Sequence, residues 1–473
     1  MFRLHRAARA LPRTASTRAY SSLPPPPPSK PLLLAGVLAA GGLGYFSVSQ
    51  LTAYQKSQPV PVPTLKQAAS LDSIDTSTPV KALTLEEANE KLREQVYSFT
   101  FAGADGNNGR VDVVRLESNN RTEDEWDLQV AQGVNGASTL FAGVYDGHAG
   151  WATSAVLRKA LISYVSSALS GVGSASPEAV DAAIKTAFNT LDEKINNRAL
   201  DAMKLGRDEA LAKIVAELAP SVAGSCALLT MYDAASKTLR TAVSGDSRAV
   251  LGSWSVDKDS FDAHALSKDQ TGFNEDEVKR LDKAHPGEKE IIDPKSGRLL
   301  GIAITRAFGD NRWKWTEEEL KEAHASYYAY SMRKPYKSPP YMTAEPEVTT
   351  RQVGNEDFVI MASDGLWDVI SNEHAVECVS RWIKAKKAGK PETVVDTKGG
   401  WRIGEDGTGQ HEVNPDYFAI EDMDSAAVCL LKNALGGNRR ELFKGMLTTY
   451  APLSRYVRDD ITIQVIFFSD PSK

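Results

Sequence analysis

Acidic residues follow hydrophobic runs at several places along the chain, where packing alone gives no reason for them. The segment VYDGHAG places Asp146, Gly147 and His148 directly after apolar residues. Asp246 lies in VSGDSRAV between two predicted strands, and Asp364 ends the run FVIMASDG. A buried carboxylate without a partner is energetically expensive, so each of these acids needs a cation or a hydrogen-bond donor.

Further acids have the same position relative to apolar segments. Asp368 follows Asp364 by four residues on an incipient helix, a spacing that lets both carboxylates face the same way. Asp459 opens the last hydrophobic segment, and Glu123 and Asp124 lie in NNRTEDEW. The set is too large to be explained by one local turn.

Divalent metal ions would stabilise so many carboxylates, whereas Arg248 and Arg458 could each neutralise only one of them. Mg²⁺ and Mn²⁺ prefer carboxylate, carbonyl and water oxygens. Asp146 would supply a carboxylate, and Gly147 has no side chain to keep its carbonyl away from an ion. Two ions sharing Asp146 would activate a bridging water, and His148 could protonate a leaving oxygen. Together these groups describe metal-assisted hydrolysis of a phosphate ester.

Each motif also has a plainer interpretation. An Asp-Gly pair is usually a turn, and GDSR could be a hairpin turn with an ion pair. His148 alone could be a surface residue at the start of a helix. Hydrophobic periodicity does not show that the acids converge, so the residues by themselves leave both interpretations open.

The elements that would position these acids are predicted from hydrophobic periodicity. SFTFAG, VDVVRLES, GSCALLTMYD, TLRTAVSGD and RAVLGSW have strand patterns, and STLFAGVYDG is predicted to be a strand buried on both faces. Helical patterns cover 150–169, 176–195, 371–388 and 424–435. Strands in meander-like runs with helices clustered between them predict the α+β class. No GxGxxG follows a strand and no GxxxxGK[ST] is present, so a nucleotide-phosphate loop is not supported.

The N-terminal part differs in composition from the rest. Residues 1–30 contain regularly spaced arginines and no acid, which is typical of a mitochondrial presequence; a disordered basic tail is the alternative. Residues 31–51 are uncharged and just long enough for a transmembrane segment in the inner membrane, or they are an apolar part of the presequence. Residues 52–83 are predicted to be a linker, and 84–473 the folded domain, which begins with a capping box in TLEEANEKL.

Charge and cysteine content narrow the function further. The net charge is −6, yet residues 1–71 hold eight Lys or Arg and no acid, so the remainder is more acidic than this value suggests. A basic leader on an acidic domain favours targeting over nucleic-acid binding. Cys226, Cys378 and Cys429 are widely separated, which predicts neither a disulfide framework nor a CxxC metal site.

Several separate motifs resemble one family in order and spacing. VYDGHAG, SGDSRAV, RAFGD, ASDGLWDV and RDDITIQVIFF lie within about residues 95–468 and resemble the metal-dependent protein serine/threonine phosphatases, the protein phosphatase 2C (PPM) family. GRLLGIAITRAFGDNRWKW, SPPYMTAEPEVT and DSAAVCLLKNALGGN are most similar to the mitochondrial pyruvate dehydrogenase phosphatase branch. The resemblance implies an α-β-β-α sandwich of two antiparallel sheets flanked by helices, with two Mg²⁺ or Mn²⁺ ions at one edge.

The resemblance also implies roles for single residues. Asp146 would bridge both metal ions, Gly147 would bind one through its carbonyl, and His148 would be the general acid. The other implied metal-site residues are Glu123 and Asp124 at the second ion, Asp364 and Asp459 at the first, and Asp246 and Asp368 at a weaker third. Asn119 stands where many members have an arginine that holds the substrate phosphate, and Arg121 is nearby but out of register, so phosphate positioning is unassigned.

The resemblance implies a phosphoprotein substrate, with phosphoserine or phosphothreonine on pyruvate dehydrogenase E1 as the favoured target, in the matrix or at the inner membrane. A phosphatase for a different mitochondrial phosphoprotein is one alternative. A second is a catalytically silent binding module with the same fold, which would be expected to lack a metal carboxylate. A third, a membrane-tethered scaffold, leaves the buried acids unexplained.

Overall fold

The computed structural model describes residues 76–173, 176–405 and 407–473, and Val80–Lys473 form one compact unit. The predicted presequence 1–30, the candidate transmembrane segment 31–51 and most of the linker 52–83 lie outside the described residues. Within the described ranges, no helix is long and apolar enough to cross a membrane. The division of the N-terminal part into these segments therefore stays a prediction.

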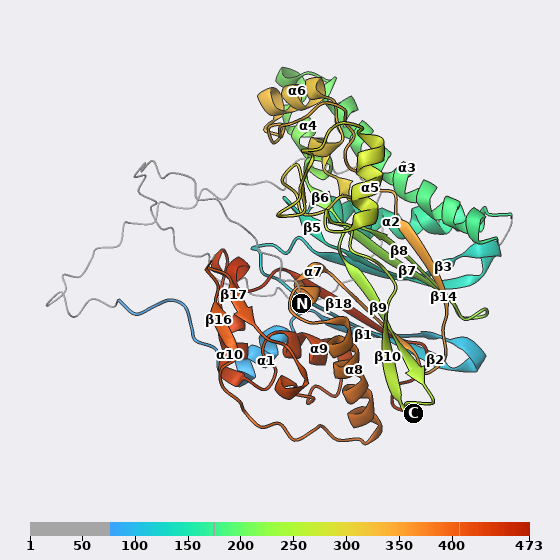
Figure 1. The fold of residues 1–473 in the computed structure, drawn as a ribbon, viewed down its shortest axis with the longest axis vertical. Helices are drawn as coiled ribbons and strands as arrows, with labels where there is room; N and C mark the ends of the chain where they lie inside the picture. The colour runs from blue at the N-terminus through green and yellow to red at the C-terminus, as the bar shows by residue number, and fades with distance from the viewer. Residues whose placement is uncertain (1–75, 174–175, 406) are drawn as a thin grey trace, which may run out of the picture. The chain divides into compact units, whose positions relative to one another are not determined.

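Two antiparallel sheets form the centre of the compact unit (Figure 1). The six-stranded sheet has the order β1 (Val96–Ala102), β2 (Asn108–Leu116), β18 (Ile461–Phe467), β15 (Phe358–Ala362), β9 (Arg248–Ser255) and β10 (Ser260–Ala265). The five-stranded sheet has the order β14 (Glu347–Gln352), β8 (Thr238–Ser244), β7 (Ala227–Asp233), β4 (Ser138–Tyr145) and β3 (Glu125–Gln132).

The two sheets pack face to face through an apolar layer to which the central strands of both contribute. Val144 and Leu228 from the five-stranded sheet and Val359, Met361 and Ile466 from the six-stranded sheet are among its buried members. Helices cover the outer faces, so β15 and β18 are buried along their whole length and β4 is buried at every residue but the first. The sequence-based prediction that β4 is buried on both faces is confirmed.

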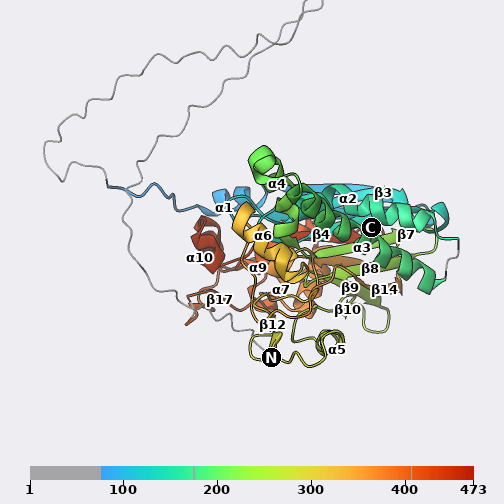
Figure 2. The same cartoon turned by 90° about the horizontal axis from the view of Figure 1, so that it is seen from above.

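Helices form the two outer layers. The helices α2 (Ala152–Ser170) and α3 (Pro177–Met203) lie alongside the five-stranded sheet in both views (Figure 1; Figure 2). The outer face of the six-stranded sheet is covered by α1 (Leu85–Leu92), α8 (Asn372–Lys387), α9 (Ala426–Ala434) and α10 (Arg440–Thr448). The expected α-β-β-α sandwich is confirmed. The capping box at Thr84 and Glu87 also begins α1 as predicted.

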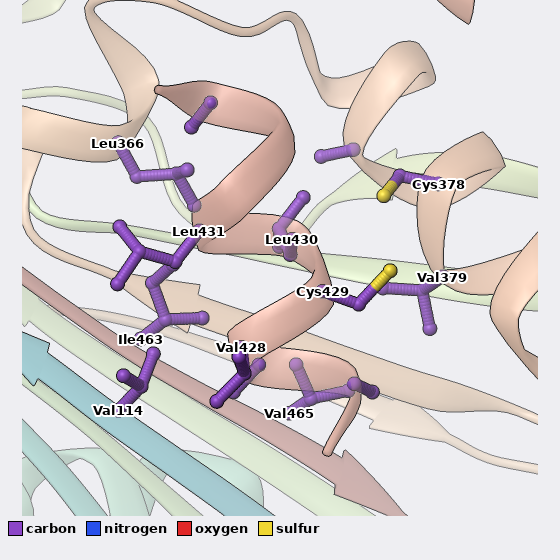
Figure 3. Packing of buried hydrophobic residues seen from close by; sticks show 14 of the residues in the cluster. Val114, Leu366, Cys378, Val379, Val428, Cys429, Leu430, Leu431, Ile463 and Val465 are labelled. Atoms are coloured by element: carbon purple, nitrogen blue, oxygen red, sulfur yellow. The ribbon is translucent and has the colours of Figure 1, made fainter. Parts of the chain in front are cut away.

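The helix α9 shows why this outer layer is stable. All nine of its residues are buried, Lys432 and Asn433 included, so it has no solvent-exposed face and is enclosed between the sheet and its neighbouring helices. Figure 3 shows Val428 and Leu431 directed toward Val465 and Ile463 of β18, while Cys429 lies toward α8. Burying such an aliphatic side chain contributes about 1.5–3 kcal/mol.

The remaining elements are additions to the sandwich. The connections between strands along the chain contain α4 (Arg207–Val222), α5 (Glu275–Ala284), α6 (Glu317–Tyr327) and the short helices α7 (Asp364–Trp367), η4 (Asn311–Trp313) and η6 (Leu453–Tyr456). Short strands form β11 (Ile292–Asp293) with β12 (Arg298–Leu299), and the hairpin of β16 (Trp401–Ile403) with β17 (Gly409–His411). A three-stranded sheet has the order β13 (Phe308–Gly309), β6 (Gly224–Ser225) and β5 (Gly147–His148).

Candidate metal centre

Three carboxylates meet where the two sheets adjoin. Asp146 follows β4 of the five-stranded sheet, Asp364 follows β15 of the six-stranded sheet, and Asp246 lies on the connection from β8 to β9. One carboxylate oxygen from each lies within 4.8 Å of the others. The backbone N–H of Asp364 also donates to Oδ2 of Asp146 over 3.4 Å. The predicted convergence of these strand-end acids is thus present in the fold.

Other predicted acids surround Asp146. Burial and the negative charges of four carboxylates raise the pKa of Asp146 well above its usual value. In order of decreasing effect, these neighbours are Asp364, Asp124, Asp246 and Asp459. Such mutual repulsion is the electrostatic state that a divalent cation relieves.

Asp124 and Asp246 are shifted for the same two reasons, burial and neighbouring acids. Burial and the charge of Asp460 raise the pKa of Asp124 to about 8, against the opposing effect of Ser363, whose hydroxyl donates to Asp124 over 2.8 Å. Burial and Asp269 raise the pKa of Asp246 to about 6. Both groups therefore hold protons more tightly than ordinary aspartates.

Glu123 and Asp368 lie at the periphery of this cluster. Burial and Asp460 raise the pKa of Glu123, while the backbone N–H of Gly150 donates to its carboxylate. Asp368 is exposed, and its charge contributes to raising the pKa of Asp246. The eight predicted metal-site positions, Gly147 among them, are thus gathered in one region.

Gly147 is required by a close approach of two backbone segments. A Cβ at this position would lie 2.3 Å from the carbonyl oxygen of Glu123 and 2.9 Å from Oγ of Ser154. The Ser154 hydroxyl donates to the same Glu123 carbonyl over 2.6 Å, which holds the loop against α2. The glycine in the DGH segment therefore has a steric reason in addition to the carbonyl ligand expected from the sequence.

Asp460, to which the sequence patterns assigned no role, organises the loop that carries Glu123. Its carboxylate accepts from the backbone N–H groups of Ser118, Asn119 and Glu123 at 2.5, 3.0 and 2.8 Å. It also accepts from the Asn119 side-chain amide at 3.1 Å. Asn119 is therefore bonded to the scaffold of the loop. The doubled acid in RDDIT was the available signal, but only Asp459 was given a role.

A second missed residue, Asp310, holds the predicted general acid. Nε2 of His148 lies 2.7 Å from Oδ2 of Asp310, which is 1% exposed. Burial lowers the pKa of His148, but the charge of Asp310 and its hydrogen bond outweigh this, so the pKa is raised. Gly224 leaves room for the pair, since a Cβ there would lie 2.1 Å from Nε2 of His148. The motif RAFGD contained this aspartate without a reason to connect it to His148.

The two arginines considered as counter-charges have other partners. Arg248 forms an ion pair with Asp269 at 2.5 Å, and Arg458 donates to backbone carbonyls, including that of Met446. Against the effect of burial, Asp269 raises the pKa of Arg248, and the charges of Asp246 and Asp368 add to this effect. That each arginine could neutralise one acid therefore stays a prediction. Within the described ranges, neither Asp124 nor Asp146 forms an ion pair with lysine or arginine.

The donor set fits hard divalent cations. The clustered groups are carboxylate oxygens without histidine or cysteine among the three that converge within 4.8 Å, and oxygen ligands are those that Mg²⁺ and Mn²⁺ prefer. The one thiol in contact, Cys226, donates to Asp246 over 3.2 Å, and its pKa is raised by burial and by that acid. It therefore stays protonated and is a poor metal ligand.

Comparison with known proteins decides the family. The sequence model of protein phosphatase 2C matches residues 105–398. The chain belongs to the protein phosphatase 2C family. It is therefore a metal-dependent protein serine/threonine phosphatase, a hydrolase of phosphate monoesters, and the resemblance seen in its motifs is confirmed.

Individual relatives of this phosphatase agree with the family assignment. A protein phosphatase 2C homolog of Schizosaccharomyces pombe is 37% identical and aligns with 76% of this chain and 80% of its own. The mitochondrial pyruvate dehydrogenase phosphatase 1 of Saccharomyces cerevisiae is 34% identical over 76% and 69% of the two chains. The mitochondrial pyruvate dehydrogenase phosphatase 2 of Homo sapiens is 32% identical over 62% of this chain and 56% of its own. A solved serine-threonine phosphatase 2C of Toxoplasma gondii aligns with 78% of this chain and 99% of its own, at 17% identity and a TM-score of 0.45.

Proposed function

We propose that this phosphatase removes phosphate from phosphoserine or phosphothreonine on pyruvate dehydrogenase E1 in mitochondria. The chemistry rests on one observation, the convergence of Asp146, Asp246 and Asp364 within 4.8 Å where the sheets adjoin. The substrate is supported by the similarity to two mitochondrial pyruvate dehydrogenase phosphatases. A different mitochondrial phosphoprotein is the second candidate, because the family itself does not specify the target.

The cofactors of this proposal are two Mg²⁺ or Mn²⁺ ions and a weaker third. Asp146 would help to hold the first two ions, Asp364 and Asp459 the first and Glu123 the second, and Asp124 would support the second ion. Gly147 would contribute its carbonyl, and Asp246 and Asp368 would hold the third ion. When bound, the ions would supply a nucleophile at neutral pH and neutralise charge on the phosphate.

His148 would act as the general acid that protonates the departing serine or threonine oxygen. Its Nε2 is engaged by Asp310, so Nδ1 is the nitrogen that would donate the proton. Because the pKa of His148 is raised, more of the imidazole is protonated near neutral pH than in a free histidine. Asp310 therefore fixes both the orientation and the charge of this ring.

The mitochondrial location in this proposal is supported by the same relatives and by the basic, acid-free composition of residues 1–30. Placement in the matrix gives direct access to pyruvate dehydrogenase. Association of 31–51 with the inner membrane rests on its apolar composition alone.

The test is phosphate release from phosphorylated pyruvate dehydrogenase E1 by the purified chain, with Mg²⁺, with Mn²⁺ and with EDTA. A phosphothreonine peptide and the Asp146→Asn variant serve as controls. Metal-dependent release from E1 well above release from the peptide supports the substrate. Release from the peptide but not from E1 refutes the substrate and keeps the chemistry, and no release from either by a folded protein refutes both.

A further inference from the structure

Arg312 is oriented by one hydrogen bond and two aromatic rings, and its terminal donors have no acceptor among the described residues. Its Nε donates to the carbonyl of Ser331 over 2.6 Å, and its guanidinium lies 5.8 and 5.6 Å from the ring centres of Trp313 and Tyr330. Among the residues that the structure describes, neither terminal nitrogen of Arg312 has a hydrogen-bond acceptor or a carboxylate partner. The group is therefore oriented by its surroundings, while its terminal N–H donors stay available.

Arg333 presents a second guanidinium two residues after Ser331, the residue whose carbonyl accepts from Arg312. Its Nε and Cζ lie 3.6 and 3.7 Å from where a Cβ on Gly301 would be, so the side chain packs on that glycine. The loop carrying it is fixed on both sides, since Met332 packs on the α4–α6 core and Tyr336 donates to the Trp315 carbonyl over 2.5 Å. Arg333 is exposed and, within the described ranges, it has no ion pair or hydrogen bond.

The two arginines repel each other. The pKa of Arg312 is lowered, first by burial and then by the positive charge of Arg333, which places the two groups within electrostatic range. Like charges held together without an anion between them cost free energy. An anion that binds both would remove this cost.

The pair lies beside the catalytic centre. Arg312 is two residues from Asp310, a separation of at most about 7 Å along the chain, and Asp310 holds His148 at 2.7 Å. The charge of Asp310 also acts on Arg312. Figure 1 shows α4 and α6, which adjoin this segment, at the same end of the unit as β5 and β6. A group bound by the arginines would thus be a near neighbour of a phosphoserine in the active site.

We propose that Arg312 and Arg333 form a subsite for an anionic side chain of the substrate protein, close in sequence to the phosphorylated residue. This inference rests on the proposed phosphatase function and adds to it a preference for acidic substrates. The anion is a carboxylate or a second phosphate, since both accept hydrogen bonds from guanidinium groups. A neutral flanking residue adds no binding free energy at this subsite, and a basic one is repelled by the two arginines.

The test uses fluorescein-labelled phosphoserine peptides that differ only two residues before or after the phosphoserine, where they carry Asp, a second phosphoserine, Asn or Lys. Binding to the metal-free full chain is measured by fluorescence anisotropy. Turnover with Mg²⁺ or Mn²⁺ is measured for the same peptides and for p-nitrophenyl phosphate, which has no flanking residue. The variants are Arg333→Ala, the charge reversal Arg333→Glu, and the control Arg351→Glu, which reverses an exposed arginine on edge strand β14.

We expect the wild-type chain to favour the Asp or phosphoserine peptide over the Asn peptide by about two- to fivefold, the range of exposed ion pairs. Arg333→Ala should remove this preference, and Arg333→Glu should reverse it in favour of Lys. Neither should change turnover of p-nitrophenyl phosphate, and Arg351→Glu should behave like wild type. Comparison of the peptide carrying Asp with the peptide carrying a second phosphoserine shows whether the subsite prefers a carboxylate or a phosphate.

Equal binding of all peptides by the wild-type chain would overturn the subsite, as would an acidic preference that survives Arg333→Glu. A charge preference in binding without turnover of any phosphate compound would instead refute the proposed function and leave the subsite standing. The two failures are therefore distinguishable.

Discussion

Metal binding to this phosphatase should release protons. In the metal-free protein, Asp124 has a pKa of about 8 and that of Asp146 is raised well above its usual value. At pH 7 a group with a pKa of 8 is about nine-tenths protonated, and Asp146 adds up to about one more proton. Metal ligands must be deprotonated, so filling the site should release between about one and two protons. Asp246, with a pKa of about 6, adds only about a tenth of a proton at this pH.

Isothermal titration calorimetry with Mn²⁺ in buffers of different ionisation enthalpy measures this number directly. Released protons are taken up by the buffer, so the observed enthalpy should decrease linearly as the buffer's ionisation enthalpy increases, with a slope of magnitude one to two. Near pH 9 the slope should fall, because Asp124 has then already lost most of its proton. An enthalpy independent of buffer at pH 7 would refute the assignment of protonated acids to the empty site.

Two variants make the experiment specific. Asp124→Asn should reduce the release by about one proton at pH 7. Asp276→Asn is the control, since a hydrogen bond to Lys268 lowers the pKa of this exposed acid and leaves it ionised. If both variants release as many protons as the wild type, the protons come from elsewhere.

The same shifts set the sign of a stability effect. The folded-state pKa of Asp124 lies above the value of 3.8 for an unperturbed aspartate, so the folded metal-free protein binds more protons than the unfolded chain between about pH 4 and pH 8. Stability should therefore fall as pH rises through this window, by up to about 1.4 kcal/mol per pH unit for each such group. Thermal unfolding at pH 6 and pH 8 with EDTA measures the effect, which saturating metal should diminish. A melting temperature that rises with pH would contradict it.

Other perturbations separate the roles of the remaining groups. Asp146→Asn should abolish turnover with an unchanged circular dichroism spectrum, and near-normal rates at saturating Mn²⁺ would refute its bridging role. Asp310→Asn should lower kcat by about tenfold or more on phenyl phosphate, and little on p-nitrophenyl phosphate, whose leaving group scarcely needs a proton; equal losses would argue against positioning of a general acid. Asp460→Ala should lower the free energy of unfolding by about 3 kcal/mol, because it leaves the N–H of Glu123 without its acceptor; an unchanged urea midpoint would contradict this. Residues 1–30 should carry a reporter to mitochondria, and a cytosolic reporter would exclude a presequence.

Local sequence patterns predicted the elements that carry the candidate site. The strand β4, the acid that follows it and the capping box of α1 could be assigned because each depends on neighbouring residues. The convergence of Asp146 with Asp364 could not, since it depends on pairing of strands that are distant in sequence. That convergence was supplied by resemblance and not by periodicity.

The missed features share a physical cause. Asp310 meets His148 across 162 residues through a sheet of two-residue strands, which leave no periodic signal. The helix α4 contains Pro220 and a kink, and the β16–β17 hairpin lies in a glycine-rich polar insert, so both lack the patterns used for prediction. Arg458 donates to the backbone carbonyl of Met446 in α10, a long-range contact that no local pattern in the sequence indicates.

Because the carboxylates lie at the junction of two sheets, metal binding should affect how firmly the sheets are held together. Asp146 belongs to one sheet and Asp364 to the other, so ions held by both residues would link the two sheets. Metal affinity would then depend on the distance between the two sheets. A substitution at Leu228 or Met361 would weaken metal binding, although both residues lie in the apolar layer between the sheets. A regulator that increased the distance between the two sheets would inhibit the enzyme without contacting the groups that carry out hydrolysis.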